Sequence, residues 1–118
     1  MNFILSSLIL FLALSLTKVI GAEVNIYSHR QPFLINPFLE KFTEETGIKT
    51  NVVYATKGLA QRLKAEGKNS PADVILTVDI GRLYIYDDLD LLASIDSDIL
   101  DKNIPQNLKS PENKWFAL

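Results

Sequence analysis

Segments typical of strands and of helices alternate through the first two thirds of this chain, and this alternation constrains the fold most strongly. The strand-like segments are rich in β-branched and aromatic residues, and the helix-like segments repeat apolar residues every three or four positions. The expected strands are 24–27, 48–54 and 74–77, and the expected helices are 33–46, 57–66 and 80–87. Such alternation predicts βαβ units around a parallel sheet, with right-handed crossovers placing the helices. We therefore expect an α/β fold in three layers.

The pattern loosens after Asp88. Leu91–Ile95 is expected to form a short edge strand, and residues 97–107 a helical turn or loop that ends near Pro105. The chain stops at Trp115–Leu118, an apolar run with no closing turn, which is typical of a strand cut in its middle. The sequence thus predicts an incomplete α/β lobe.

The amino-terminal segment has the features of an export signal. The apolar run Phe3–Leu16 falls within the roughly 7–15 residues of a signal-peptide core and below the ~20 residues of a spanning helix. Small residues precede Glu23, so cleavage is expected there, although the run extends far enough to leave an uncleaved membrane anchor as the alternative. We expect 1–22 to be the signal of an exported protein and 23–118 to be its α/β domain.

Composition excludes several classes of function. The chain has 118 residues, no cysteine and a formal net charge of −2, and no Lys/Arg cluster stands out. The lack of cysteine excludes zinc knuckles, thiol catalysis and disulfides. The charge makes nucleic acid an unexpected partner.

The loops after the three expected strands, at 28–31, 55–57 and 77–82, are the candidate ligand site. Ligands of open α/β sheets bind beyond the carboxyl ends of the strands, and the helix that starts after each loop favours an anion. The candidate pocket residues are Arg30, Gln31, Thr77, Asp79 and Arg82. The competing interpretation is structural: Arg82 pairs with Asp79 three residues away, and Arg30 is simply solvated.

His29 is the only histidine, and it is the candidate metal ligand of the chain. Zinc sites need three or four converging ligands, and no others are suitably spaced, so a loop histidine without a ligand is the alternative. Tyr84 and Tyr86 lie two residues apart on an expected helix, where they point about 200° apart and cannot face one ion. We interpret them as packing residues.

The sequence contains no nucleophile elbow, no phosphate-binding glycine loop and no paired catalytic carboxylates. These absences favour a binding domain over an enzyme. An exported or cytoplasmic α/β enzyme, or a receiver-like domain with Asp79 at its strand end, stays open as the alternative.

Several motifs together resemble the N-terminal part of the ferric-iron-binding periplasmic proteins, the substrate-binding components of iron(III) ABC transporters. The resemblance covers essentially all of 23–118, and its motifs are Val24–Ser28, Arg30–Pro32, Phe42–Lys49, Leu63–Gly67, Asn69–Val74 and Leu76–Leu83. It implies two α/β lobes joined by a hinge, with the ligand in the cleft, and makes this chain most of the first lobe.

The resemblance also implies a ligand and partners. The family's main tyrosine ligands lie in a later part of the protein, and Gln31-Pro32 replaces the His-Tyr dipeptide that some members use in the first loop. Iron(III), as the ion or a chelate, would be held with a synergistic anion, and an ABC permease would be the membrane partner. Arg30 and Arg82 are the candidates to hold or neutralise the anion.

Overall fold

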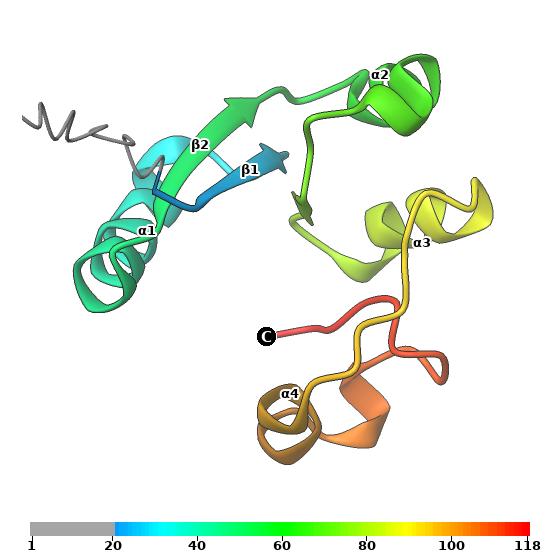
Figure 1. The fold of residues 1–118 in the computed structure, drawn as a ribbon. Coiled ribbons are helices and arrows are strands. Elements are labelled where there is room, and N and C mark those ends of the chain that lie inside the picture. The colour runs from blue at the N-terminus through cyan, green and yellow to red at the C-terminus, as the bar shows by residue number, and fades with distance from the viewer. Residues whose placement is uncertain (1–20) are drawn as a thin grey trace, which may run out of the picture.

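The computed structural model describes residues 21–118, so the expected signal core lies outside the described residues. All six predicted strands and helices are confirmed, with ends within two residues of those expected (Figure 1). In chain order the elements are β1 (Glu23–Ser28), α1 (Pro32–Thr46), β2 (Lys49–Tyr54), α2 (Leu59–Glu66), β3 (Val74–Leu76), α3 (Ile80–Asp88) and α4 (Asp98–Asn103). Within 21–118 no helix combines the length and apolarity that crossing a membrane requires.

The three strands form one parallel sheet in the order β2-β1-β3. β1 pairs with β2 from Glu23↔Lys49 to Ser28↔Tyr54, and its second half pairs with β3. The chain leaves β1 toward one side through α1 and then passes back over β1 through α2 to reach β3. Right-handed crossovers in opposite directions place these helices on opposite faces, so a topological switch point lies at the carboxyl ends of β1 and β3.

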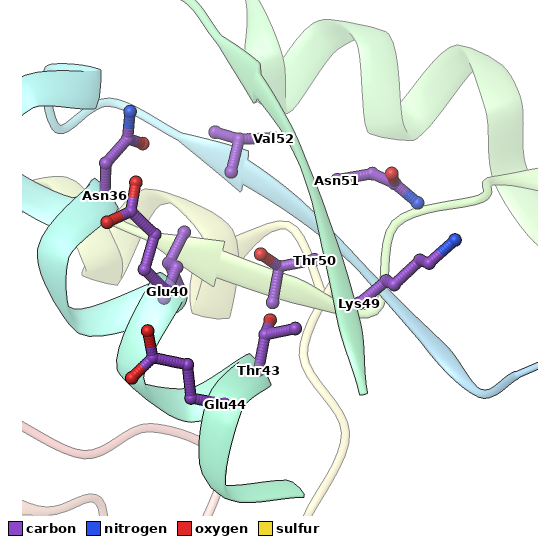
Figure 2. A pocket seen from close by; sticks show the side chains of 9 residues that line it. Asn36, Glu40, Thr43, Glu44, Lys49, Thr50, Asn51 and Val52 are labelled. Atoms are coloured by element: carbon purple, nitrogen blue, oxygen red, sulfur yellow. The ribbon is translucent and has the colours of Figure 1, made fainter. Parts of the chain in front are cut away.

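Successive side chains of a strand point to opposite faces of the sheet, and different helices cover the two faces. The face with Tyr27 packs against α2 and α3 in the main core; its buried residues are Tyr27, Leu59, Ala60, Leu63 and Tyr86. On the other face Figure 2 shows Thr50 of β2 toward Thr43 of α1, while Asn51 projects from the opposite side of the strand. The predicted three-layer α/β arrangement is therefore confirmed.

Local chemistry sets the ends of the helices. α1 begins with Pro32, where a missing N–H costs little, and ends at Gly47, whose φ of 73° supplies a left-handed cap. α2 begins at Leu59, two residues later than predicted, because Gly58 at φ 86° lies outside helical geometry. α3 begins after Asp79, whose side chain accepts the backbone N–H of Arg82.

Two predictions for the last thirty residues are wrong. Leu91–Ile95 forms no strand: the Leu91 N–H donates to the Tyr86 carbonyl, and the Ile95 N–H donates to the Asn113 carbonyl. Trp115–Leu118 contributes a single antiparallel bridge, Lys109↔Phe116. Apolar segments become strands only where a neighbouring backbone offers a ladder, and here Leu91 and Leu92 pack their side chains against the core instead.

Candidate functional site

Backbone hydrogen bonds hold the three strand ends at one edge of the sheet. The His29 N–H, just after β1, donates to the Leu76 carbonyl at the end of β3 (2.8 Å). The Ala55 N–H, just after β2, donates to the Ser28 carbonyl (3.1 Å). The expectation that the loops after β1, β2 and β3 gather at one edge is confirmed.

The loop after β1 is shaped by Ser28. Its fully buried hydroxyl donates to the Arg30 carbonyl (2.9 Å) and accepts the Arg30 N–H (3.0 Å). The Arg30 side chain is exposed and makes no ion pair with the part of the chain that the structure describes. Gln31 precedes α1 without capping it by a side-chain hydrogen bond. Arg30 is therefore available to an anion, whereas the start of α1 offers few donors, because Pro32 has no N–H and the Leu34 N–H donates to the Gln31 carbonyl (3.0 Å).

The loop after β3 is organised by Asp79. The Thr77 hydroxyl donates to the Asp79 carbonyl (2.9 Å), and the Asp79 carboxylate accepts the Arg82 backbone N–H (2.7 Å). The spacing of 79 and 82 thus reflects an N-cap, and residues 21–118 contain no ion pair between these two side chains. The competing interpretation of a side-chain pair between Asp79 and Arg82 is therefore not supported. Because a carboxylate already occupies the N-terminus of α3, a second anion is less favourable there.

The guanidinium of Arg82 turns toward the loop after β2. Its Nη1 donates to the Thr56 carbonyl (3.1 Å), and the side chain is half-buried. An arginine carries five N–H donors, so this bond leaves most of them for another acceptor. Arg82 therefore links α3 to the β2 loop and keeps its positive charge without a carboxylate partner among the described residues.

His29 is buried, and both of its ring nitrogens are hydrogen-bonded. Nδ1 lies 2.8 Å from the Ala55 carbonyl oxygen, and Nε2 lies 2.6 Å from the Tyr86 hydroxyl oxygen. A carbonyl can only accept, so Nδ1 carries the proton; in that tautomer Nε2 is an acceptor for the Tyr86 proton. Burial raises the pKa of Tyr86, and this outweighs the charge of Arg82, which lowers it. The Tyr86 hydroxyl therefore stays protonated.

This pairing bears on the expectation that His29 is a metal ligand. With both nitrogens occupied, the ring offers no lone pair to a metal in this arrangement. Among residues 21–118 no group of three or more His, Asp or Glu side chains lies close enough to hold a metal ion. The arrangement favours the alternative of a histidine with a structural role.

The tyrosines of this segment are also engaged elsewhere. The Tyr27 hydroxyl donates to both oxygens of the Glu66 carboxylate (2.8 and 2.9 Å), and the Arg62 guanidinium lies 4.8 Å from the Tyr27 ring centre. Burial and the neighbouring Glu66 raise the pKa of Tyr27. Tyr84 is half-exposed with its ring 6.1 Å from that of Trp115. Tyr27 and Tyr86 are thus locked in the core as neutral phenols, which are poor ligands for a hard cation.

A hollow of about 200 Å³ opens beside these groups. His29, Arg82 and Tyr86 line it together with the start of α2; the remaining lining residues are Thr56, Lys57, Gly58, Leu59, Ala60, Gln61 and Ile85. The cationic side chains of Lys57 and Arg82 therefore border one small space together with the N-terminus of α2, which has no side-chain cap. Gln61 was not predicted as part of a site, because its only sequence signal is a position inside the first turn of a helix.

A larger groove of about 500 Å³ lies between α1 and β2 (Figure 2). Its charged residues are Glu40, Glu44 and Lys49, and it contains none of the residues predicted from the strand ends. We place the candidate site at the smaller hollow and the adjoining Arg30 loop, because there the switch point coincides with positive charge that makes no ion pair within residues 21–118.

Comparison with known proteins gives a consistent set of relatives. A curated relative, iron uptake protein A1 of Synechocystis, is 44% identical over 96 residues, covering 80% of this chain and 27% of that protein. The Fe(3+)-binding periplasmic protein of Serratia marcescens is 30% identical over 115 residues, covering 91% of this chain and 34% of that protein.

Solved structures extend the likeness to three dimensions. The ferric iron-binding protein A of Mannheimia haemolytica, in an open conformation, superposes with a TM-score of 0.78 at 51% identity, covering 81% of this chain and 30% of that one. A Trichodesmium protein (IdiA, FutA) in complex with iron and citrate gives a TM-score of 0.74 at 43% identity, covering 80% and 30%.

The chain spans about a third or less of the length of these relatives. The resemblance that the sequence motifs carry is confirmed. Because the profile of the bacterial extracellular solute-binding proteins matches residues 27–118, the chain belongs to that family.

Proposed function

We propose that this chain forms part of a periplasmic solute-binding protein that delivers iron(III) to an ABC transporter. The names of its relatives, an iron uptake protein and an Fe(3+)-binding periplasmic protein, support iron(III) as the cargo. The observation that carries the proposal is the positive charge of Arg30 and Arg82 at the switch point of the sheet, where neither makes an ion pair with another described residue. Residues 1–22 act as the export signal, and the mature chain begins at Glu23.

In this proposal the described half-site holds an anion, and other parts of the protein supply most of the oxygen ligands of iron(III). Arg30 and Gln31 face the anion from one side, and Thr77 and Arg82 from the other. Asp79 supports this edge by capping α3. The cargo is iron(III) as the ion or as a chelate, and the anion would fill its remaining coordination positions.

The receiver-like alternative gains little from the geometry of Asp79. A receiver would use this carboxylate as a free acceptor, whereas here it accepts the Arg82 N–H and caps α3. The proposed function is therefore binding and transport, with no catalytic step assigned to these residues.

The test is a titration of the full-length protein that carries this chain with iron(III) citrate. Arg30→Ala and Arg82→Ala are each expected to weaken iron(III) binding about tenfold or more, since a charge-assisted hydrogen bond to the anion is lost. Lys41→Ala, an exposed cation on α1 that pairs with Glu45, is the matched control and should change affinity less than twofold. Absence of iron(III) binding by the unaltered protein would refute the proposal.

A further inference from the structure

Two consecutive carbonyls in the loop after β2 are held by donors from two different elements. The Ala55 carbonyl accepts from His29 Nδ1, which follows β1, and the Thr56 carbonyl accepts from Arg82 Nη1 on α3. Loop backbone usually bonds to water or to near neighbours in the chain. Here two side chains from distant segments fix it at adjacent positions.

The two donors are also joined to each other through Tyr86. Tyr86 follows Arg82 by four residues, so both lie on one face of α3. Its hydroxyl donates to His29 Nε2 at 2.6 Å, and the two rings are tilted with centres 5.9 Å apart. The His29 backbone N–H donates to the Leu76 carbonyl. His29 thus contacts the ends of β2 and β3 and the helix α3 at once.

The hydrogen-bonded pair of His29 and Tyr86 is buried, so its directional hydrogen bonds constrain the position of the loop. His29 is 8% exposed and Tyr86 is 1% exposed. An apolar pair could fill the same space, but it would not select one position of the loop. A neutral imidazole with its proton on Nδ1 is satisfied only when the Ala55 carbonyl and the Tyr86 hydroxyl are both in place.

We propose that His29, Tyr86 and Arg82 form a positioning clamp that fixes the loop 55–58 and aims the guanidinium of Arg82 at the ligand. The loop leads through Gly58, at φ 86°, directly into the uncapped N-terminus of α2. His29 and Tyr86 act through the loop and through Arg82, because their hydrogen-bonding groups are bound to the Ala55 carbonyl and to each other rather than to the ligand. The clamp rests on the proposed function in one respect, namely that the ligand is iron(III) with its anion.

The experiment compares Tyr86→Phe, His29→Asn and the double variant in the full-length protein. Asn places an amide donor near the Nδ1 position, so it keeps the bond to Ala55 and loses the acceptor for Tyr86. Because both single variants remove the same bond, each should weaken iron(III) citrate binding about three- to tenfold, and the double variant no more than either single one. Tyr84→Phe is the matched control, since its hydroxyl makes no hydrogen bond with the described residues, and should stay within twofold.

Nuclear magnetic resonance of the ligand-free protein distinguishes the clamp from a tyrosine that only fills space in the core. The clamp predicts a neutral His29 with its proton on Nδ1. It also predicts that Tyr86→Phe shifts the amide signals of residues 55–58 and the Arg82 side-chain signals, whereas Tyr84→Phe does not. A proton on Nε2, or unchanged 55–58 signals in Tyr86→Phe, would overturn the clamp.

The outcomes separate the clamp from the proposed function. If the unaltered protein binds no iron(III), the proposed function fails, while the spectra still decide whether the clamp exists. If iron(III) binds but the effects of His29→Asn and Tyr86→Phe add in the double variant, the clamp is refuted and the function stands. If a variant fails to fold, the protonation state of His29 and its coupling to Tyr86 are read from the unaltered protein.

Discussion

Residues 23–88 and residues 89–118 use the same kinds of amino acid but build very different structure. In the first region every strand is paired, and helices α2 and α3 bury side chains in one core around Tyr27. In the second region α4 has six residues and buries none of them, and the only strand-type pairing is the bridge between Lys109 and Phe116. The difference shows that apolar content alone does not produce regular structure.

The two regions meet at Leu91 and Leu92, which pack against the core, and at a few side chains near the end of the chain. The Trp115 ring lies near that of Tyr84, and Lys114 Nζ lies 3.9 Å from an Asp87 carboxylate oxygen. Ile104 and Trp115 supply the buried apolar surface of the second region. We infer that the part of the second region after Leu92 is held onto α3 and contributes little to the stability of the first region.

The largest effect is expected when core volume is removed from the first region. Leu63→Ala leaves a cavity beside Tyr27 and should lower the free energy of unfolding by about 2–5 kcal/mol. Ile99→Ala, at a residue 73% exposed in α4, should change it by less than about 0.5 kcal/mol. Urea unfolding followed by circular dichroism measures both variants.

The single tryptophan makes this test sharper. Trp115 lies in the second region, so its fluorescence reports that region, while most of the circular dichroism comes from the first. We expect the fluorescence transition to come at a lower urea concentration. Coincident transitions, or equal effects of Leu63→Ala and Ile99→Ala, would contradict the division into two regions.

The same contrast explains how much the sequence could predict. In the first region the local pattern and the long-range contacts agree: the apolar spacing of Leu59, Ala60 and Leu63 predicts the face that packs on Tyr27. In the second region the run Leu91–Ile95 has strand composition, but its backbone bonds go to the end of α3 and to Asn113. A strand depends on its partner, and no local signal reports a missing one.

The candidate site divides in a similar way. Its location at the strand ends follows from the alternation of elements and from the rule for parallel sheets. The bond of Arg82 to the Thr56 carbonyl and that of His29 to Tyr86 span 26 and 57 residues of sequence. Spacing could suggest that Asp79 and Arg82 interact, but not that the interaction is a helix cap rather than an ion pair.

A smaller effect is expected from the helix caps, because each region has one of the same kind. Asp79 accepts the Arg82 N–H at 2.7 Å, and Ser97 accepts the Leu100 N–H at 3.3 Å. Asp79→Ala should cost about 1 kcal/mol of unfolding free energy, since α3 anchors Tyr86 in the core. Ser97→Ala should cost clearly less, because α4 itself buries no side chain.

The control for the caps is Asp79→Asn, which keeps a capping oxygen and should recover most of the lost stability. Urea titrations of the three variants under one condition provide the measurement. An equal loss in Asp79→Ala and Ser97→Ala would mean that α4 is coupled to the global unfolding of the chain. The two-region description would then need to be abandoned.

The smallest expected effect is the pH dependence of the first region, which centres on Glu66. Its carboxylate accepts hydrogen bonds from Arg62, Ser70 and Tyr27, and these bonds, Arg62 first, lower the pKa of Glu66 below its usual value of 4.5. A carboxyl whose pKa is depressed in the folded state stabilises that state above its unfolded pKa. This contribution is lost as the pH falls through the lower folded value. The effect is modest because Arg62 is half-exposed and solvent screens the pair.

Glu66→Gln should therefore flatten the decline of unfolding free energy between pH 5 and acidic conditions, as measured by urea unfolding at a series of pH values. Glu45→Gln is the matched control, since Glu45 also lies four residues after a cation but at 3.8 Å and on an exposed face of α1. It should leave the pH profile almost unchanged. If the acid transition of circular dichroism keeps its slope in Glu66→Gln, the stabilisation of the first region comes from its apolar core and paired strands without a contribution from this network.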